Sequence, residues 1–329
     1  MQNRLNGIGI NLMGATTHQE VKGIQLAGIY NVNGSSMNGI QMAGITNVNG
    51  GETNGLSFSG LVNITGGSSR GMLFSGLTNI VGGEAKGVVM GGLMNITTGN
   101  SSGLHMAGLA HIAGDSFSGL QFSGLLNITG GDLNGLQLSG IGNITAGTAR
   151  GVQLAPFNVA VRGKGLQIGL VNYYREKLDG FQLGLVNANP DTRVQLMLFG
   201  GNTTRANIAA RFKNRLFYTI LGTGAWQQGV DEKFSTAFFY RAGLELPLNK
   251  RFFISGDLGY QHIETFKNKD LGLPARLYAL QARANLEYRL TETFGLFVSG
   301  GYGTSRHYNR DATFDKGIIV EGGIVLFKY

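Results

Sequence analysis

The sequence contains no cysteine, only four prolines, and no run of about 18 or more apolar residues. Without cysteine there is no disulfide framework, no thiol nucleophile and no cysteine-ligated metal site. The scarcity of proline excludes a collagen-like or proline-rich disordered chain. The lack of a long apolar run excludes a transmembrane helix, so a membrane role would require a closed β-barrel, where every backbone polar group is paired.

Charged residues are also scarce, at 14% of the chain, and they are unevenly distributed. Residues 1–164 carry 7 Lys+Arg and 5 Asp+Glu, which leaves 20 and 14 of the totals of 27 and 19 for residues 165–329. This break predicts two domains, a glycine-rich repeat region over 1–192 and a second domain over 193–329. Although the net charge is +8, the basic residues are not clustered. We therefore expect no nucleic-acid partner.

Glycine, with 55 residues, is the most conspicuous component, and it recurs every 16 residues from Gly7 to Gly151. The unit at 119–134 reads GLQFSGLLNITGGDLN: positions 2, 4 and 7 are apolar, position 6 is glycine and position 9 is asparagine. Apolar spacing of two residues predicts short strands. The position-9 asparagines are Asn31, Asn47, Asn63, Asn79, Asn95, Asn127 and Asn143.

Two arrangements fit this repeat. In a β-solenoid each unit is one coil, identical positions stack, and the asparagines form a hydrogen-bonded ladder. Alternatively, each unit is one strand of a larger transmembrane barrel. After Gly151 the units lose one residue beside the central glycine, as in Gly165–Asn172. That loss would switch the faces of a flat strand but is tolerated at a solenoid corner, so we favour the solenoid.

The second domain shows eight amphipathic runs with the alternation of an antiparallel barrel. In the run 276–289, apolar residues such as Tyr278 and Leu280 alternate with Gln281 and Arg283. Aromatic residues near both ends of the apolar faces and alternately short and long connections are typical of membrane barrels. We therefore predict an all-β chain ending in a transmembrane barrel of about eight strands. The runs are 193–201, 204–213, 216–228, 235–247, 252–264, 276–289, 294–307 and 316–329.

An eight-stranded barrel has room only for side chains in its lumen, so charges that point inward must be paired. The alternation places Arg211 and several further charged residues on the inward face. We predict that they form a charge network that fills the lumen, and a selective channel is the alternative. The further members are Arg241, Glu245, Asp257, Arg283, Glu287 and Arg289.

The C-terminal segment Val325-Leu-Phe-Lys-Tyr329 resembles the assembly signal of outer-membrane proteins, with Val325, Phe327 and Tyr329 as the signal residues. Residues 193–329 resemble the small outer-membrane barrels of Bacteroidota, and the Gly-x-Gln-x-Gly-Leu-x-Asn units resemble short bacterial surface repeats. The resemblance implies the outer membrane of a Gram-negative bacterium. It also implies two partners, membrane lipid and the barrel-assembly machinery. The repeat array adds a third expected partner, another envelope protein bound through the repeats, with capping of the barrel as the alternative.

Two expectations accompany this resemblance. Residues 1–4 lead into the repeat without an apolar segment, so an exported protein would be in its mature form. Glu321 shares alternation parity with Val325, Phe327 and Tyr329, and would face lipid unless a β-bulge resets the strand.

Candidate catalytic residues are few. His262 and His307 lie near the outer ends of two predicted strands, with Glu264 and Ser305 close in sequence. Some small outer-membrane barrels are lipid hydrolases that use Ser, His and an acid, but no motif here fixes such a triad. His18, His105 and His111 lack metal-ligand spacing. We therefore expect no enzymatic activity, no cofactor and no metal, with a lipid hydrolase as the weaker alternative.

These observations together predict a non-enzymatic outer-membrane protein. The barrel would anchor the chain, and the repeats would serve envelope structure or protein–protein interaction. The simplest position for the repeats is the periplasmic side. Their nearly uncharged composition indicates a surface that is packed against something rather than solvated all round.

Overall fold

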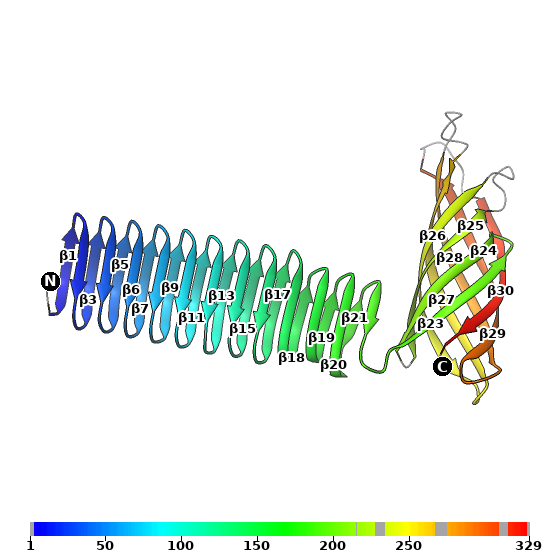
Figure 1. Cartoon of the computed structure of the whole chain (residues 1–329), viewed down its shortest axis with the longest axis horizontal. Helices are drawn as coiled ribbons and strands as arrows, with labels where there is room; N and C mark the ends of the chain where they lie inside the picture. The colour runs from blue at the N-terminus through cyan, green and yellow to red at the C-terminus, as the bar shows by residue number, and fades with distance from the viewer. Residues whose placement is uncertain (1–2, 215, 228–233, 267–274, 309–314, 328–329) are drawn as a thin grey trace. The chain divides into compact units, whose positions relative to one another are not determined.

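The computed structural model of the chain (Figure 1) describes residues 3–214, 216–227, 234–266, 275–308 and 315–327. The chain is all-β and divides into two compact units, Met1–Gly184 and Leu185–Tyr329. The first is a parallel β-solenoid and the second contains a closed barrel of eight strands. The predicted fold class is confirmed, and the alternative of one larger barrel is wrong. The boundary between the units precedes the predicted one, which lay between 192 and 193.

Each 16-residue unit of the solenoid forms one coil with a seven-residue strand, a corner at the central glycine and a four-residue strand. The seven-residue strands are β1 (Leu5–Asn11), β3 (Val21–Ala27), β5 (Met37–Ala43), β7 (Thr53–Ser59), β9 (Ser69–Ser75), β11 (Ala85–Gly91), β13 (Ser101–Ala107), β15 (Phe117–Ser123) and β17 (Leu133–Ser139). The four-residue strands are β2 (Gly14–Thr17), β4 (Tyr30–Asn33), β6 (Thr46–Asn49), β8 (Val62–Thr65), β10 (Thr78–Val81), β12 (Met94–Thr97), β14 (Ala110–Ala113) and β16 (Leu126–Thr129). The coils then change in β18 (Gly142–Leu154), β19 (Phe157–Ile168), β20 (Val171–Leu178) and β21 (Phe181–Leu183), and β22 (Val186–Ala188) follows in the second unit.

The glycine at the first position of each unit explains the strict period. Successive coils pair in parallel and in register, so that Gly87 lies beside Gly103 and Gly71. Gly87 has a φ of +122°, a conformation that residues with a side chain rarely adopt. A Cβ built there would lie 2.1 Å from the carbonyl oxygen of Gly71. Positive φ and close backbone approach therefore both require glycine at this position.

The shortened units keep the stack intact. Gly142 pairs with Phe157 and Leu154 pairs with Ile168, and the register shifts between Thr145 and Thr148. The residue missing from the shortened coil is the glycine at the corner, where Ala155 and Pro156 make the connection. The strands on either side of the corner therefore keep their faces.

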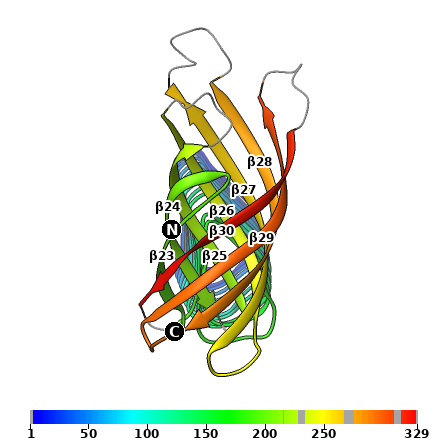
Figure 2. The same cartoon turned by 90° about the vertical axis from the view of Figure 1, so that its right-hand side faces the viewer.

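The barrel (Figure 2) is antiparallel and closes by pairing of its first and last strands. Each of its eight strands corresponds to one of the amphipathic runs in the sequence. They are β23 (Arg193–Gly201), β24 (Thr204–Asn214), β25 (Phe217–Gln227), β26 (Ser235–Pro247), β27 (Phe252–Thr265), β28 (Arg276–Arg289), β29 (Phe294–His307) and β30 (Asp315–Leu326).

The connections at one end of the barrel are short turns, such as that closed by the hydrogen bond from Leu248 N to the Phe252 carbonyl, 2.9 Å. The three longer connections expected at the other end, over 229–234, 266–275 and 309–315, lie largely outside the described residues. No helix in the described part of the chain is long and apolar enough to cross a membrane.

Candidate functional site

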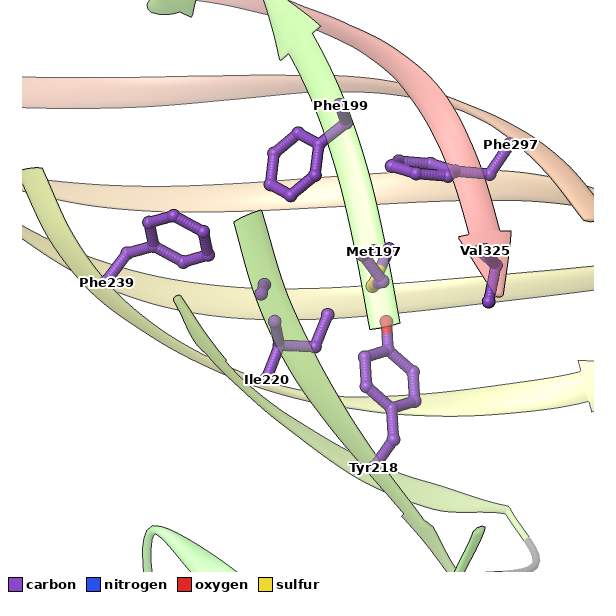
Figure 3. Packing of buried hydrophobic residues seen from close by; sticks show 8 residues of the cluster. Met197, Phe199, Tyr218, Ile220, Phe239, Phe297 and Val325 are labelled. Carbon is purple, nitrogen blue, oxygen red and sulfur yellow. The ribbon is translucent and has the colours of Figure 1, made fainter. Parts of the chain in front are cut away.

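The barrel lumen is packed with side chains. Along each strand, buried residues that point inward alternate with residues exposed on the outer wall. Phe199 contacts Phe239 and Phe297 edge-on, with ring centroids 5.8 and 5.6 Å apart. Figure 3 shows the apolar cluster to which these rings belong. Its members are Met197, Phe199, Ala209, Tyr218, Ile220, Phe239, Phe297 and Val325.

Four cations and four anions are buried beside this cluster. Arg211 forms a two-pronged pair with Glu287 at 2.7 and 3.1 Å, and Lys213 pairs with Glu245. Such pairing satisfies both charges in a site that excludes water. The lumen therefore carries no net charge from its buried residues.

Glu321 connects two of the four cations. Its carboxylate accepts hydrogen bonds from both terminal nitrogens of Arg241, at 2.8 and 3.0 Å, and lies 3.2 Å from Nε of Arg283. Arg283 also lies 3.6 Å from Asp257, which accepts a hydrogen bond from the Tyr218 hydroxyl at 3.0 Å. Glu321 thus joins charges from two other strands directly, and Arg283 links it to Asp257 on a third.

The structure buries Arg211, the first of the seven lumen residues named from the sequence, and places the other six as follows. Arg241, Glu245, Asp257, Arg283 and Glu287 are buried in the network, and Arg289, which is partly exposed, lies over the Phe253 ring at 4.6 Å. The sequence analysis missed Lys213 and Glu321. Lys213 could have been found, because it follows Arg211 at a spacing of two on the same strand face.

The expected orientation of the last strand is wrong. Glu321 and Val325 both point into the lumen, with 3% and 0% of their surface exposed, whereas Ile318 and Val320 lie on the outer wall. β30 pairs with both neighbours without a register shift, so no bulge resets it. Phe327 lies beyond the strand with a φ of 77° and is exposed, and Tyr329 lies outside the described residues.

The candidate hydrolase residues are separated by the barrel wall. Ser305 and His307 share the inward parity of β29, whereas His262 and Glu264 lie on the outward parity of β27. His262 is 3.2 Å from the Tyr308 hydroxyl, and Glu264 is 3.5 Å from Arg276. The four side chains therefore do not meet in one triad. Nowhere in the described ranges do three or more His, Asp or Glu side chains gather as a metal site requires.

The interior of the solenoid is lined by polar ladders. The Asn79 side chain donates to Oδ1 of Asn95 at 2.9 Å and to the Met90 carbonyl at 2.8 Å, and accepts from Asn63 at 2.9 Å. All seven position-9 asparagines are buried in equivalent places, and Asn158 and Asn172 continue the ladder. A second ladder, which the sequence analysis did not identify, joins Gln121, Gln137, Gln153, Gln167 and Gln182 at 2.7–2.8 Å.

Two histidines interrupt these ladders. His105 and His111 occupy the interior places where other coils carry glutamine and asparagine, and their ring nitrogens lie 2.7 Å apart. Desolvation lowers the pKa of His105 to about 4, and the pKa of His111 lies well below its usual value for the same reason. Both imidazoles are therefore neutral at pH 7, which lets one donate to the other.

The exterior of the solenoid is apolar on three sides. Positions 2 and 4 cover one broad face, position 10 covers the other, and leucine or isoleucine at position 7 covers the glycine corner. Charged residues gather at the opposite edge as pairs such as Glu84–Lys86 at 2.8 Å and Asp132–Arg150 at 2.7 Å. We call the side chains at position 7 the leucine edge; they are 38–45% exposed. The leucine edge consists of Ile29, Ile45, Leu61, Leu77, Leu93, Leu109, Leu125 and Ile141.

A shallow groove of about 940 Å³ runs beside the leucine edge. Position-4 side chains form one wall, and the glycines and small residues of positions 5 and 6 form the floor. Phe58 and Phe74 stack in this wall with their ring centroids 5.0 Å apart. The groove therefore presents almost no polar side chain larger than serine.

No family model matches this chain, and comparison with curated proteins and with solved structures finds no match.

Proposed function

We propose that this chain is a non-enzymatic protein of a Gram-negative outer membrane, in which the barrel anchors a repeat array that serves envelope structure and interaction. The observation that carries the proposal is the polarity of the barrel. Its outer wall exposes large apolar residues, with Leu258 and Ile318 each 71% exposed, while its buried charges are paired inside. Water does not favour such a wall, whereas lipid does. The likeness of the last strand to an outer-membrane assembly signal supports the location.

Substitution of a single outer-wall residue tests the anchor. Leu258 lies in the middle of β27 and Leu248 lies in a short turn, and both are largely exposed. If the wall faces lipid, Leu258→Arg lowers the free energy of unfolding in vesicles by about 2–4 kcal/mol, and Leu248→Arg lowers it by about 0–1 kcal/mol. Both changes in the free energy of unfolding are measured by urea titration, in which folded and unfolded protein are distinguished by their electrophoretic mobility in unboiled samples. Equal, small effects would show that lipid does not cover Leu258.

A channel is the competing function, and the packing of the lumen bears on it. The rings of Phe199 and Phe239 and the guanidinium of Arg241, 4.9 and 4.7 Å from them, occupy one level of the barrel. We expect the wild-type protein to give no discrete conductance steps in planar bilayers. Reproducible single-channel steps that are absent from bilayers without the protein would contradict the anchor proposal and support a channel.

A lipid hydrolase is the weaker alternative, since Ser305 and His262 lie on opposite sides of the wall. It predicts that His262→Ala or His307→Ala abolishes the release of fatty acid from outer-membrane phospholipid. We expect no such release from the wild-type protein. The partners that the anchor proposal implies are membrane lipid, the barrel-assembly machinery and an envelope component that contacts the repeats.

A further inference from the structure

We infer that the solenoid lies in one leaflet of the membrane, with acyl chains covering its two broad faces and its leucine edge and with its charged edge at the headgroups. This inference rests on the proposed function, because the barrel would hold the chain at the membrane. It goes further by naming what covers the repeats.

The first argument is the inverted polarity of the coil. A protein in water places apolar side chains inside and polar ones outside. Here the interior combines ladders such as Asn63, Asn79 and Asn95, all at most 1% exposed, with small apolar clusters such as that of Phe117 and Leu133, while leucines and isoleucines recur on the outside of every regular coil. Apolar burial is worth about 25 cal/mol per Å² in water, so an exterior of this kind needs a cover. Lipid supplies it without any change in the fold.

The second argument concerns the backbone. In lipid a backbone N–H or C=O group without an internal partner is costly. The N–H groups are paired even at the glycine corner, where Gly92 N donates to the Ser75 carbonyl at 3.1 Å and Leu93 N donates to the Leu77 carbonyl at 2.8 Å. The same two bonds recur from coil to coil, and the carbonyl of the corner glycine is the group at each corner of the described coils that accepts no N–H. The sides of the solenoid can therefore contact acyl chains with every corner N–H paired.

The third argument distinguishes lipid from a second copy or a partner protein. Either of those would cover one face, whereas the apolar surface continues over two faces and the edge between them. A leaflet covers all three at once. The first glycine of a coil and its corner glycine are five residue steps apart, which is roughly 17 Å at about 3.3 Å per residue. That depth is close to half of a hydrocarbon core of about 30 Å and too short to cross it.

The charged edge fits the headgroup level. Its ion pairs carry both signs, as in Arg70–Glu52 at 3.2 Å, and their side chains are about half exposed. At the other edge, the apolar groove beside Leu26, Met42 and Phe58 would accept acyl chain segments, because its lining carries few polar atoms.

The absence of cysteine makes the test direct, since single cysteines can carry a nitroxide label at chosen sites of the full-length protein. We would place labels at Leu93→Cys and Leu125→Cys on the leucine edge, and at Ser102→Cys and Asn134→Cys beside the charged edge. Leu258→Cys on the barrel wall is the lipid reference. Each variant is reconstituted in phospholipid vesicles, and collisions with oxygen and with a water-soluble nickel complex are compared.

We expect the oxygen-to-nickel collision ratio at Leu93 and Leu125 to equal that at Leu258. It should exceed that at Ser102 and Asn134 by at least about fivefold, because oxygen concentrates in hydrocarbon and the nickel complex does not enter it. A water-exposed ratio at Leu93 and Leu125 with a lipid ratio at Leu258 would overturn this inference and leave the anchor standing. A water-exposed ratio at Leu258 would overturn the anchor itself. Low collision with both reagents and spin–spin broadening at Leu93 would mean that a second copy covers the edge, which also overturns the inference.

Discussion

At the scale of single residues, Glu321 is a buried carboxylate on which two lumen cations depend. It is 3% exposed and faces two guanidinium groups, those of Arg241 and Arg283. Removal of one partner from a buried ion pair leaves an uncompensated charge and costs about 3–5 kcal/mol.

We therefore expect Glu321→Gln to lower the free energy of unfolding of the barrel by about 3–5 kcal/mol in urea titrations in detergent or vesicles. The matched control is Glu264→Gln, because its pair with Arg276 lies on the exterior with the Arg276 side chain 61% exposed. That change should cost no more than about 1 kcal/mol. Similar losses for both variants would contradict the assigned role of Glu321.

The buried histidine pair gives a pH dependence. Since the pKa of His105 is about 4 in the fold and about 6.5 when unfolded, the unfolded chain binds more protons between these values. The free energy of unfolding should thus fall as the pH drops from 6.5 to about 4, by roughly 3 kcal/mol. Chemical unfolding of the solenoid, followed by circular dichroism at pH 7 and at pH 4, measures this.

The control replaces the pair by the residues of the regular coils, as His105→Gln with His111→Asn. The double variant should lose most of the pH dependence, because neutral amides occupy the same interior places without titrating. If wild type and double variant follow the same pH profile, the histidines are not its source.

At the scale of elements, the stability of a coil depends on bonds to its neighbours. Asn79→Ala removes three hydrogen bonds, to Asn95, to Met90 and from Asn63. With about 1 kcal/mol for each, the coil should lose roughly 3 kcal/mol. The loss should be local, because each coil contacts only the next one on either side. Hydrogen exchange of amides 63–95 is the measurement. Thr78→Ala, a change outside the ladder, should leave their exchange unchanged.

The side chain of Asn202 extends the pairing between the first and last strands of the barrel. Asn202 follows β23 and continues its pairing with β30: its Nδ2 donates to the Ile318 carbonyl at 2.7 Å and its Oδ1 accepts from Val320 N at 2.9 Å. We expect Asn202→Ala to cost about 1–2 kcal/mol and to speed hydrogen exchange at the Val320 amide. Thr203→Ala is the neighbouring control. Unchanged hydrogen exchange at Val320 in N202A would show that the backbone hydrogen bonds between β23 and β30 are enough to protect this amide.

At the scale of the whole molecule, the apolar exterior of the repeats should determine how the purified protein behaves in detergent. We expect the triple variant Leu93→Ser, Leu109→Ser and Leu125→Ser to keep its fold, since these side chains are already about 40% exposed. It should bind less detergent, as measured by light scattering with size-exclusion chromatography, because less apolar surface is offered. Ser102→Ala, Ser118→Ala and Asn134→Ala together form the control. Equal detergent binding by both variants would contradict the prediction.

The sequence alone determined the elements and much of their stacking. A period of 16 with glycine at its first position predicted identical coils, because only glycine accepts the positive φ and close approach seen at Gly87. The asparagine at position 9 predicted the ladder, since an amide can donate to and accept from its own copy in the next coil. The loss of one residue in the units after Gly151 favoured the solenoid over one larger barrel. In a flat strand that loss would move the following side chains to the opposite face, whereas a solenoid corner absorbs it.

Only the tertiary structure decided which face of the last barrel strand points inward. Alternation groups residues into two faces but does not say which one is interior, and for this reason Glu321 was expected on the wrong side of the last strand. Closure of β30 against β23 and β29 settled it, since Arg241 and Arg283 from distant strands meet the carboxylate there. In the solenoid the same choice placed the amide ladders inside, beside buried apolar residues such as Leu133, and the leucines and isoleucines of position 7 outside. The physical reason is that stacked amides satisfy one another across coils, whereas an apolar side chain can be covered either in the interior or from outside.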